Sequence, residues 1–426
     1  MGLLILLGLF AVCVIIGVPV AFALGVAALA AIAYEGLPLL IGFQRIISGV
    51  TVFSLMAIPF FIFAGELMFH GGIAIRLVRF ASAAVGWMRG GLGVVNVFSS
   101  MLFGGISGSA VADISALGSI LIPVMKEKGY GDDYAVNVTV TSSIAGILIP
   151  PSHNMILFAV AAGGGVSISQ LFVAGIVPGV VMCVCLAAAA YFVAVKRGYP
   201  AEVFPGATAL LISFLVALPG LFTAVIIVGG VLSGVFTVTE SGAFGTIYAA
   251  LITALAYRSL TWENFKLAVV RSVRTTSMVM ILIACAAAFA YMLTFYQVPS
   301  RMVGFLTSIS DNWIVILLMI NLMLLVLGMI MDMAALILIC TPIFLPVVKL
   351  LEIDPLQFGM ILMMNLGLGL CTPPVGACLF VGCAIGKVPI EKAVKTIWPF
   401  YLAILVALML TTFIPAISLT LPGLFN

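Results

Sequence analysis

The sequence predicts an all-α polytopic membrane protein that contains two inverted repeats, about ten transmembrane helices, two re-entrant hairpins and two broken helices. The composition is 64% hydrophobic and 7% charged, which lies far outside the range of a soluble domain of 426 residues. The apolar runs are continuous and about 20 residues long, as a helix needs to cross the hydrocarbon core, whereas a transmembrane barrel has short alternating segments. The third observation is that one segment of the chain occurs twice.

The repeated segment covers residues 104–154. An offset of 223 residues carries Gly105 onto Gly328, Gly146 onto Gly369, and the double proline Pro150-Pro151 onto Pro373-Pro374. Each half therefore has a double proline at the same distance after a glycine-containing turn. Matching breaks in the hydrophobic segments of two halves indicate the binding centre of a transporter.

The first repeat is predicted to span residues 1–197. The opening MGLLILLGLF has no basic residue before its apolar run, so we expect a first membrane helix and not a cleaved signal peptide. The predicted elements, in order, are apolar spans at 3–17, 18–34 and 53–70, a basic amphipathic helix at the membrane surface at 73–89, a hairpin at about 92–124, a broken helix at about 134–162 and a span at 171–195.

Two features of this half predict its irregular elements. The stretches 92–103 and 110–124 are each about half a span long and are joined by the glycine- and serine-rich turn 104–109, with basic residues on both flanks. Such a pair enters and leaves the membrane on one side, and protein or water must cover its exposed backbone. The helix at 134–162 is broken at Pro150-Pro151 because proline lacks an amide hydrogen and clashes with the preceding turn.

A cytoplasmic linker at 198–206 precedes the second repeat, which is predicted to span residues 207–426. The predicted elements are spans at 208–232, 240–257 and 277–296, a basic amphipathic loop at 258–274, a hairpin at about 313–347 with its tip at 328–333, a broken helix at about 356–385 interrupted at Thr372, Pro373 and Pro374, and a last span at 397–417.

The distribution of basic residues predicts the orientation. If the first hairpin opens to the cytoplasm, 14 of the 17 basic residues are cytoplasmic, and the exceptions are Arg45, Arg301 and Lys349. The positive-inside rule then places both termini outside, and the two repeats have opposite orientations. We expect the hairpin tips to meet near the centre of the membrane.

The predicted tips carry the candidate binding residues. Ser107 and Ser109 offer hydroxyls, and the break at 149–152 offers carbonyls without helical partners; such oxygen ligands suit a hard cation such as sodium. The serines could equally satisfy a helix turn or allow close packing. Asp332, the repeat equivalent of Ser109, is an ionisable group at membrane depth and therefore a functional candidate.

Two further residues could contact a polar substrate. Asn154 follows the first break and offers both a donor and an acceptor. Glu240 begins a span after two threonines, and it could either line the cavity or cap its helix.

The sequence also contains a string that allows an enzymatic alternative. The string Gly105-Ile106-Ser107-Gly108 is compatible with the nucleophile of an intramembrane serine protease, with His153 or His70 as its base. The second copy of the segment carries Asp332 where a serine would be needed and has no histidine, which weakens this alternative. The sequence also lacks an ATP-binding loop of the form GxxxxGK[ST] and any CxxC pair, so we expect no cofactor and transport driven by an ion gradient.

The motifs GGISGSAVAD, ILIPPS, GMIMDMAA and TPPVG, with the segment from Pro123 to Tyr130, resemble the large membrane subunit of the tripartite ATP-independent periplasmic (TRAP) transporters, the DctM type. The resemblance covers essentially the whole chain in motif order and spacing. It implies an elevator-type symporter of the ion transporter superfamily in the bacterial inner membrane, which imports organic acids with sodium. It also implies two partners, a small four-helix membrane subunit and a periplasmic substrate-binding protein, and no nucleic acid.

The resemblance also implies site residues. The first sodium site is expected at Ser107, Gly108, Ser109, Gly146, Pro150 and Ser152, and the second at Asp332, Gly369, Thr372, Pro373 and Gly376. Substrate is expected near Ser109, Asn154, Asp332 and Glu240. Because the chain lacks the extra N-terminal spans of fused family members, we expect the small subunit to be a separate chain. A carboxylate symporter that works without a binding protein stays an alternative, and no residue selects among dicarboxylates, sugar acids and sialic acid.

Overall fold

A computed structural model describes residues 1–425 and shows an almost entirely helical chain, which confirms the predicted fold class. Within that range the only strand-like pairing is an isolated bridge between Arg89 and Ala201. Six helices are long and apolar enough to cross a membrane, or eight when each of two bent pairs counts as one span. The protein is therefore a multi-pass membrane protein, while the number of ten spans stays a prediction.

The first half of the chain contains twelve α-helices and two short irregular helices. Their bounds are α1 (Gly2–Ile16), α2 (Val20–Tyr34), α3 (Leu39–Val50), η1 (Phe53–Met56), α4 (Ala57–His70), α5 (Ile73–Val85), α6 (Gly91–Ser107), α7 (Ala110–Asp113), η2 (Ile114–Gly118), α8 (Ser119–Glu127), α9 (Asp132–Ser142), α10 (Ala145–Leu148), α11 (His153–Ala161) and α12 (Ile168–Lys196).

The second half begins after the linker and is described up to residue 425. Its bounds are α13 (Ala207–Leu232), α14 (Val238–Leu251), η3 (Ile252–Ala256), α15 (Trp262–Phe295), α16 (Val298–Ile309), α17 (Trp313–Gly328), α18 (Met333–Leu350), α19 (Pro355–Leu370), α20 (Ala377–Gly386), α21 (Ile390–Thr396), α22 (Trp398–Phe413) and α23 (Ala416–Leu424).

The offset of 223 residues that relates the motifs also relates the helices. It carries the stretch formed by α7, η2 and α8 onto α18, from Ala110 onto Met333 and from Glu127 onto Leu350. It likewise carries the start of α9 at Asp132 onto the start of α19 at Pro355. The hairpins and broken helices are thus repeated as structure as well as sequence, and their inverted orientation in a membrane stays a prediction.

The structure corrects two expected boundaries and adds two helices. The basic stretch 258–274 was expected to be a loop, but from Trp262 onward it is the first half of α15, because Thr261 caps the helix and neither glycine nor proline interrupts it. The first hairpin arm extends to Ser107, so the turn is shorter than the expected 104–109. The helices α3 and α16 lie in segments for which no helix was expected.

Helix α5 was expected to lie at the membrane surface. It is helical, and its apolar residues Ile73, Leu77 and Ala81 are fully buried. This face packs against α6 and α13. Of its basic residues, Arg79 is exposed, whereas Arg76 is half-buried, with its guanidinium 3.9 Å from the centre of the Tyr257 ring.

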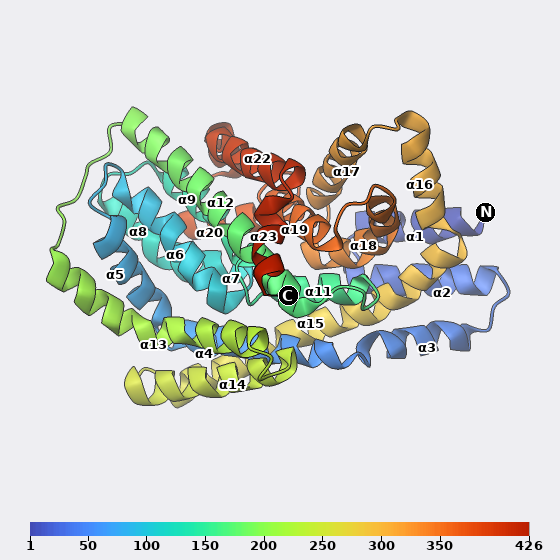
Figure 1. Ribbon diagram of the computed structural model, residues 1–426, viewed down its shortest axis with the longest axis horizontal. Helices are drawn as coiled ribbons and strands as arrows, with labels where there is room; N and C mark the ends of the chain where they lie inside the picture. Colours follow the sequence, from blue (N-terminus) through green and yellow to red (C-terminus); the bar gives the residue numbers. More distant parts are fainter. Residues whose placement is uncertain (426) are drawn as a thin grey trace.

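The helices form two groups. Figure 1 shows α3, α4, α13, α14 and α15 lying together along the lower edge of the molecule, with the hairpins and broken helices above them. Within the lower group, α4 packs against α14 and α15, and α15 also packs against α2 and α3. We call this group with α2 the scaffold.

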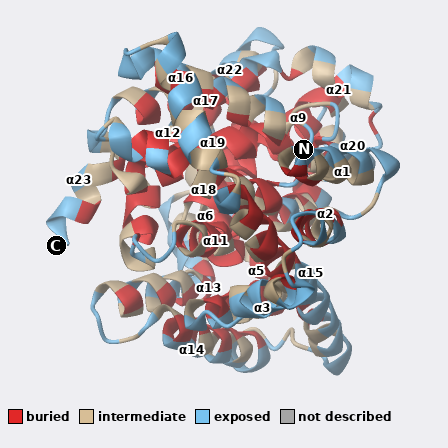
Figure 2. Cartoon of the chain, turned by 90° about the vertical axis from the view of Figure 1, so that its right-hand side faces the viewer, coloured by how far each residue is buried: buried red, intermediate tan, exposed pale blue. Residues whose placement is uncertain are grey.

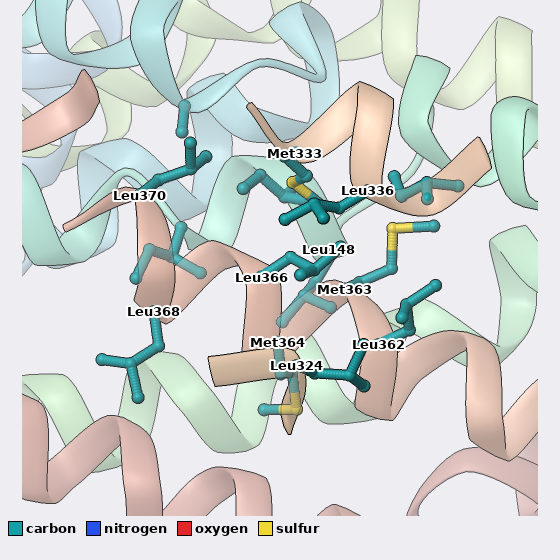
Figure 3. Close-up of a cluster of buried hydrophobic side chains, with 14 of the residues drawn as sticks. Leu148, Leu324, Met333, Leu336, Leu362, Met363, Met364, Leu366, Leu368 and Leu370 are labelled. Carbon is teal, nitrogen blue, oxygen red and sulfur yellow. The ribbon is translucent and has the colours of Figure 1, made fainter. Parts of the chain in front are cut away.

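The hairpins and broken helices of both repeats share one core. Figure 3 shows Leu148 of α10, Leu324 of α17, Leu336 of α18 and Leu366 of α19 in one cluster of apolar side chains, and all four are essentially inaccessible. In a membrane, close packing of this kind stabilises the helices mainly through van der Waals contact.

Apolar side chains also cover the outer faces of the scaffold. Figure 2 shows buried residues concentrated in the middle and exposed residues along the outer sides of α3 and α14. On α3 the exposed side chains include Leu40, Phe43 and Ile47. An outer surface of this composition is expected to face lipid or a partner helix.

Candidate functional site

The turn of the first hairpin is a tight connection between α6 and α7. Gly108 adopts the left-handed conformation with φ 60°, and Ser109 is the N-cap of α7, where its hydroxyl accepts a hydrogen bond from the Ala112 amide at 3.4 Å. A β-carbon on Gly108 would lie 2.7 Å from the carbonyl oxygen of Pro151 and 3.1 Å from Cα of Ser152. Only glycine therefore fits this turn against the first broken helix.

The first break separates α10 from α11 and contains a cis Pro150-Pro151 bond. The helical segments on either side of the break, Asp132–Leu148 and His153–Ala161, meet at an angle of 53°. The hairpin approaches this break closely at its glycines, because a β-carbon on Gly146 would lie 3.2 Å from Cα of Gly104. The structure thus brings together the six residues of the expected first sodium site, which are Ser107, Gly108, Ser109, Gly146, Pro150 and Ser152.

Two hydroxyls of this group lack partners. Ser152 is fully buried and Ser107 is 9% exposed. Within residues 1–425, neither hydroxyl oxygen has a hydrogen-bond partner. An unpaired buried hydroxyl costs free energy, so a ligand that bonds to it would be stabilised there. Ser107 also forms no hydrogen bond with either histidine of the described chain, so no serine–histidine pair is assembled for proteolysis.

The second hairpin has the same plan with different chemistry. Asp332 is the N-cap of α18, and its carboxylate accepts a hydrogen bond from the Ala334 amide at 2.9 Å. The turn is tied to the second break by the Val375 amide, which donates to the carbonyl of Met329 at 3.1 Å. A β-carbon on Gly369 would lie 2.6 Å from the carbonyl oxygen of Gly328, so hairpin and broken helix cross at glycines here too.

The second break, from Cys371 to Gly376, contains a cis Pro373-Pro374 bond. The Thr372 hydroxyl donates to the carbonyl of Leu368 at 2.7 Å, and its oxygen keeps a lone pair free for another partner. Gly376 is the N-cap of α20 and has φ 27°. The expected second-site residues therefore lie at the break that the second hairpin contacts.

The two hairpin turns meet at one cavity of about 290 Å³. Ser109, Asn154 and Asp332 all line it, so three of the four expected substrate residues share one space. The start of α11 at His153 also borders the cavity. Helix amino ends at a cavity favour an anionic ligand, because their free amides and dipoles are positive.

Glu240, the fourth expected substrate residue, lies elsewhere. Its carboxylate accepts a hydrogen bond from the Thr237 amide at 2.8 Å, and the Thr237 hydroxyl accepts one from the Glu240 amide at 3.2 Å. This is a capping box at the start of α14, and Glu240 is not among the residues that line the cavity. Of the two roles considered from the sequence, the structure shows the cap.

One wall of the cavity was missed by the sequence reasoning. Helix α15 contributes Thr275, Met278, Val279 and Leu282 to the lining. Thr275 lies before the span expected at 277–296, and Met278, Val279 and Leu282 lie inside that span but carry no polar group that would have marked them. The spacing of four, three and four residues from Arg271 through Thr275 and Met278 to Leu282 is the signal that marks one face of a helix.

Helices that cross a membrane, two hairpins and two breaks around one cavity define a polytopic membrane transporter. A similar fold is seen in the crystal structure of the YdaH transporter from Alcanivorax borkumensis, with a TM-score of 0.61, 13% sequence identity and 87% of each chain covered. The chain matches the family described as "Tripartite ATP-independent periplasmic transporter, DctM component" over residues 7–417. It belongs to this family and is the large permease of a TRAP transporter.

Named relatives cover nearly the whole chain. The C4-dicarboxylate TRAP transporter large permease protein DctM of Rhodobacter capsulatus is 35% identical, with 100% of both chains covered. The sialic acid TRAP transporter large permease protein SiaM of Vibrio cholerae is 36% identical over 96% of each chain. The isethionate TRAP transporter permease protein DctMQ of Oleidesulfovibrio alaskensis is 36% identical over 98% of this chain and 66% of its own length.

Proposed function

We propose that this permease imports an organic acid across the bacterial inner membrane together with sodium ions. The observation that supports this most directly is that two repeat-related N-caps, Ser109 and Asp332, line one cavity at the meeting point of both hairpins. The relatives named for C4-dicarboxylates and sialic acid point to a carboxylate as the substrate class. The amino ends of α7 and α11 provide the positive environment for that group.

The residues around each hairpin turn fit sodium. At the first turn the unpaired hydroxyls of Ser107 and Ser152 are buried, at the second turn Asp332 offers a carboxylate, and the break that this turn contacts offers the Thr372 hydroxyl. All of these are hard oxygen ligands. Sodium bound there would link each hairpin turn to its broken helix and so complete the substrate site.

We further propose that the hairpins and broken helices move as one body against the scaffold. These elements of both repeats pack together in one core, and residues of the scaffold helices α2, α4 and α15 border that core. The substrate cavity lies between this body and α15 of the scaffold. A rigid-body displacement along α15 would carry the cavity across the membrane while it keeps the contacts between the hairpins and the broken helices, and only their contacts with the scaffold would change.

The family is tripartite, and we propose that this chain works with a small membrane subunit and a periplasmic substrate-binding protein. The longer relative named DctMQ is consistent with a second membrane component. The deciding experiment is uptake into proteoliposomes that contain this chain and its small subunit, with the cognate binding protein outside and a sodium gradient imposed or omitted. The probes are succinate, sialic acid and isethionate.

Accumulation that requires both sodium and the binding protein supports the proposal. Accumulation without the binding protein indicates a conventional carboxylate symporter. Accumulation that persists without any sodium gradient contradicts sodium coupling.

A further inference from the structure

A second cavity of about 280 Å³ adjoins the substrate cavity. The two have four lining residues in common, which are Ser109, Val111, His153 and Thr275. The second cavity extends from these residues between the first hairpin and the scaffold helices α4 and α15. A molecule that leaves the substrate cavity on this side must therefore pass through it.

Unlike the substrate cavity, this second cavity is lined by two ionisable residues of the scaffold, Glu66 and Arg271, that no role yet explains. Glu66 and His70 lie one turn apart on α4, with Oε2 of Glu66 at 3.3 Å from Nε2 of His70. Arg271 of α15 borders the same cavity, and its positive charge acts on both of them. Among residues 1–425, the Arg271 guanidinium has neither a hydrogen-bond acceptor nor an ion-pair partner in contact.

A guanidinium with all its donors free beside a cavity is suited to a carboxylate. Its planar fork binds both carboxylate oxygens at once, and such charge-assisted pairs are stronger than neutral hydrogen bonds. Glu66 opposes this attraction from the other wall. The combination would bind an anion and still let it leave, as a site on a transport path must.

Helix α15 connects this arginine to the substrate cavity. Arg271 borders only the second cavity, Thr275 borders both, and Met278 borders only the substrate cavity. These residues follow one face of the helix at spacings of four and three. The basic end of this face lies in the segment that the charge distribution predicts to be cytoplasmic.

We infer that Arg271 forms a second carboxylate subsite, which the organic anion occupies between the substrate cavity and the cytoplasm, and that Glu66 weakens it. This inference rests on the proposed function. Arg271 belongs to the scaffold and would stay in place while the hairpin body moves. The anion would therefore first contact the helix amino ends of the moving body and then the guanidinium of the scaffold.

The test uses a cysteine reporter and needs no transport. Ser115 borders the second cavity but not the substrate cavity, and its hydroxyl bonds only to the carbonyl of Val111 at 2.8 Å, so Ser115→Cys is a mild change. The full chain with its small subunit is labelled with a sulfonated, negatively charged thiosulfonate and with a trimethylammonium thiosulfonate. The chain with its native cysteines alone gives the background, and Ala112→Cys, which borders the same cavity, is the second reporter.

We expect Arg271→Gln to lower the ratio of anionic to cationic labelling rates by about tenfold, because a charge inside a cavity sets the local concentration of ions. Glu66→Gln should raise the ratio. The matched control is Arg274→Gln, which removes the same charge one turn away from a side chain that borders neither cavity, and it should leave the ratio nearly unchanged. Equal effects of the two arginine variants overturn the inference.

Carboxylate binding is read out by protection. Succinate or sialic acid at millimolar concentration should slow labelling of the reporter when Arg271 is present and not in Arg271→Gln. If neither carboxylate slows it, the subsite is overturned even where the charge effect is present. Because labelling requires neither a sodium gradient nor the binding protein, a failure of sodium-coupled uptake would leave this result unaffected.

Discussion

Ser109 and Asp332 occupy equivalent positions in the two repeats, and both line the cavity between the hairpins. Each is the N-cap of the helix that follows its hairpin turn, with the Ala112 amide donating to Ser109 at 3.4 Å and the Ala334 amide donating to Asp332 at 2.9 Å. One repeat thus presents a neutral hydroxyl and the other a carboxylate. For the sodium sites proposed above, this asymmetry predicts different ion affinities in the two halves.

Asp332→Asn should raise the sodium concentration for half-maximal uptake by at least about tenfold, because it removes a charged ligand while asparagine caps a helix as well as aspartate does. Thermal stability without sodium should stay the same. The measurement is initial uptake rate against sodium concentration in proteoliposomes.

The matched control is Asp354→Asn, which removes a carboxylate from a helix cap outside the cavity. Asp354 caps α19 through the Leu356 amide at 2.7 Å and does not border the cavity. Its variant should keep the wild-type sodium dependence. A normal sodium dependence in Asp332→Asn would contradict the assignment of this carboxylate to the ion.

The unpaired hydroxyls give a second prediction. Ser152→Ala should leave the melting temperature in sodium-free buffer unchanged or slightly higher, because the hydroxyl has no partner to lose and its burial costs free energy. The same variant should lose most of the rise in melting temperature that sodium produces, which reflects ion binding to the folded state. Ser107→Ala should behave in the same way.

A buried hydroxyl with a partner provides the contrast. The Ser143 hydroxyl donates to the carbonyl of Val140 at 2.7 Å. Ser143→Ala should lose about 1 kcal/mol of stability in both buffers and keep the sodium-induced rise. Should Ser152→Ala retain the full rise, its hydroxyl does not bind the ion.

Much of the site was predictable because the chain repeats its breaks. The double prolines at Pro150 and Pro373 end helices wherever they occur, and glycines at 105 and 328 mark the turns, so the hairpins and broken helices follow from local chemistry. The repeat also pairs Ser109 with Asp332. Because their contacts depend on how the hairpins pack, only the structure shows that both reach one cavity.

The scaffold was less predictable because basic residues obscured its helix. The offset of 223 residues carries α3 and α4 onto α15, from Leu39 onto Trp262 and from Gly72 onto Phe295. It also carries α5 onto residues that overlap α16. Applied to the whole chain, the repeat would have indicated α16, because α5 was expected to be helical, but not α3, because its counterpart was itself expected to be a loop. The threonine three residues before Glu240 made a helix cap one of the two roles considered for it, and only the structure shows that Glu240 does not border the cavity.

The packing of the first turn gives a third prediction. Gly108→Ala should lower stability by at least about 3 kcal/mol, because a left-handed alanine costs roughly 1–2 kcal/mol and the added carbon would meet the Pro151 carbonyl. Uptake should fall with it. Gly129→Ala separates the two causes, since Gly129 has φ 81° and open space around its missing β-carbon.

Gly129→Ala should show only the conformational cost and keep uptake. Thermal unfolding followed by tryptophan fluorescence, together with uptake, measures both variants. Equal losses in the two variants would mean that the contact between Gly108 and the first break adds nothing to the strained conformation.

Glu240 provides the last prediction, because its two possible roles have opposite consequences. As half of a capping box it can be replaced by glutamine, which accepts the same hydrogen bond from the Thr237 amide, so Glu240→Gln should keep both the melting temperature and the KM for substrate. Glu240→Ala should lower the melting temperature and still leave KM unchanged. Thr237→Ala, which removes the other half of the box, should reproduce that loss of stability. A rise in KM of about threefold or more in Glu240→Gln, at an unchanged melting temperature, would restore Glu240 to the substrate site, since only uniform binding would then have been lost.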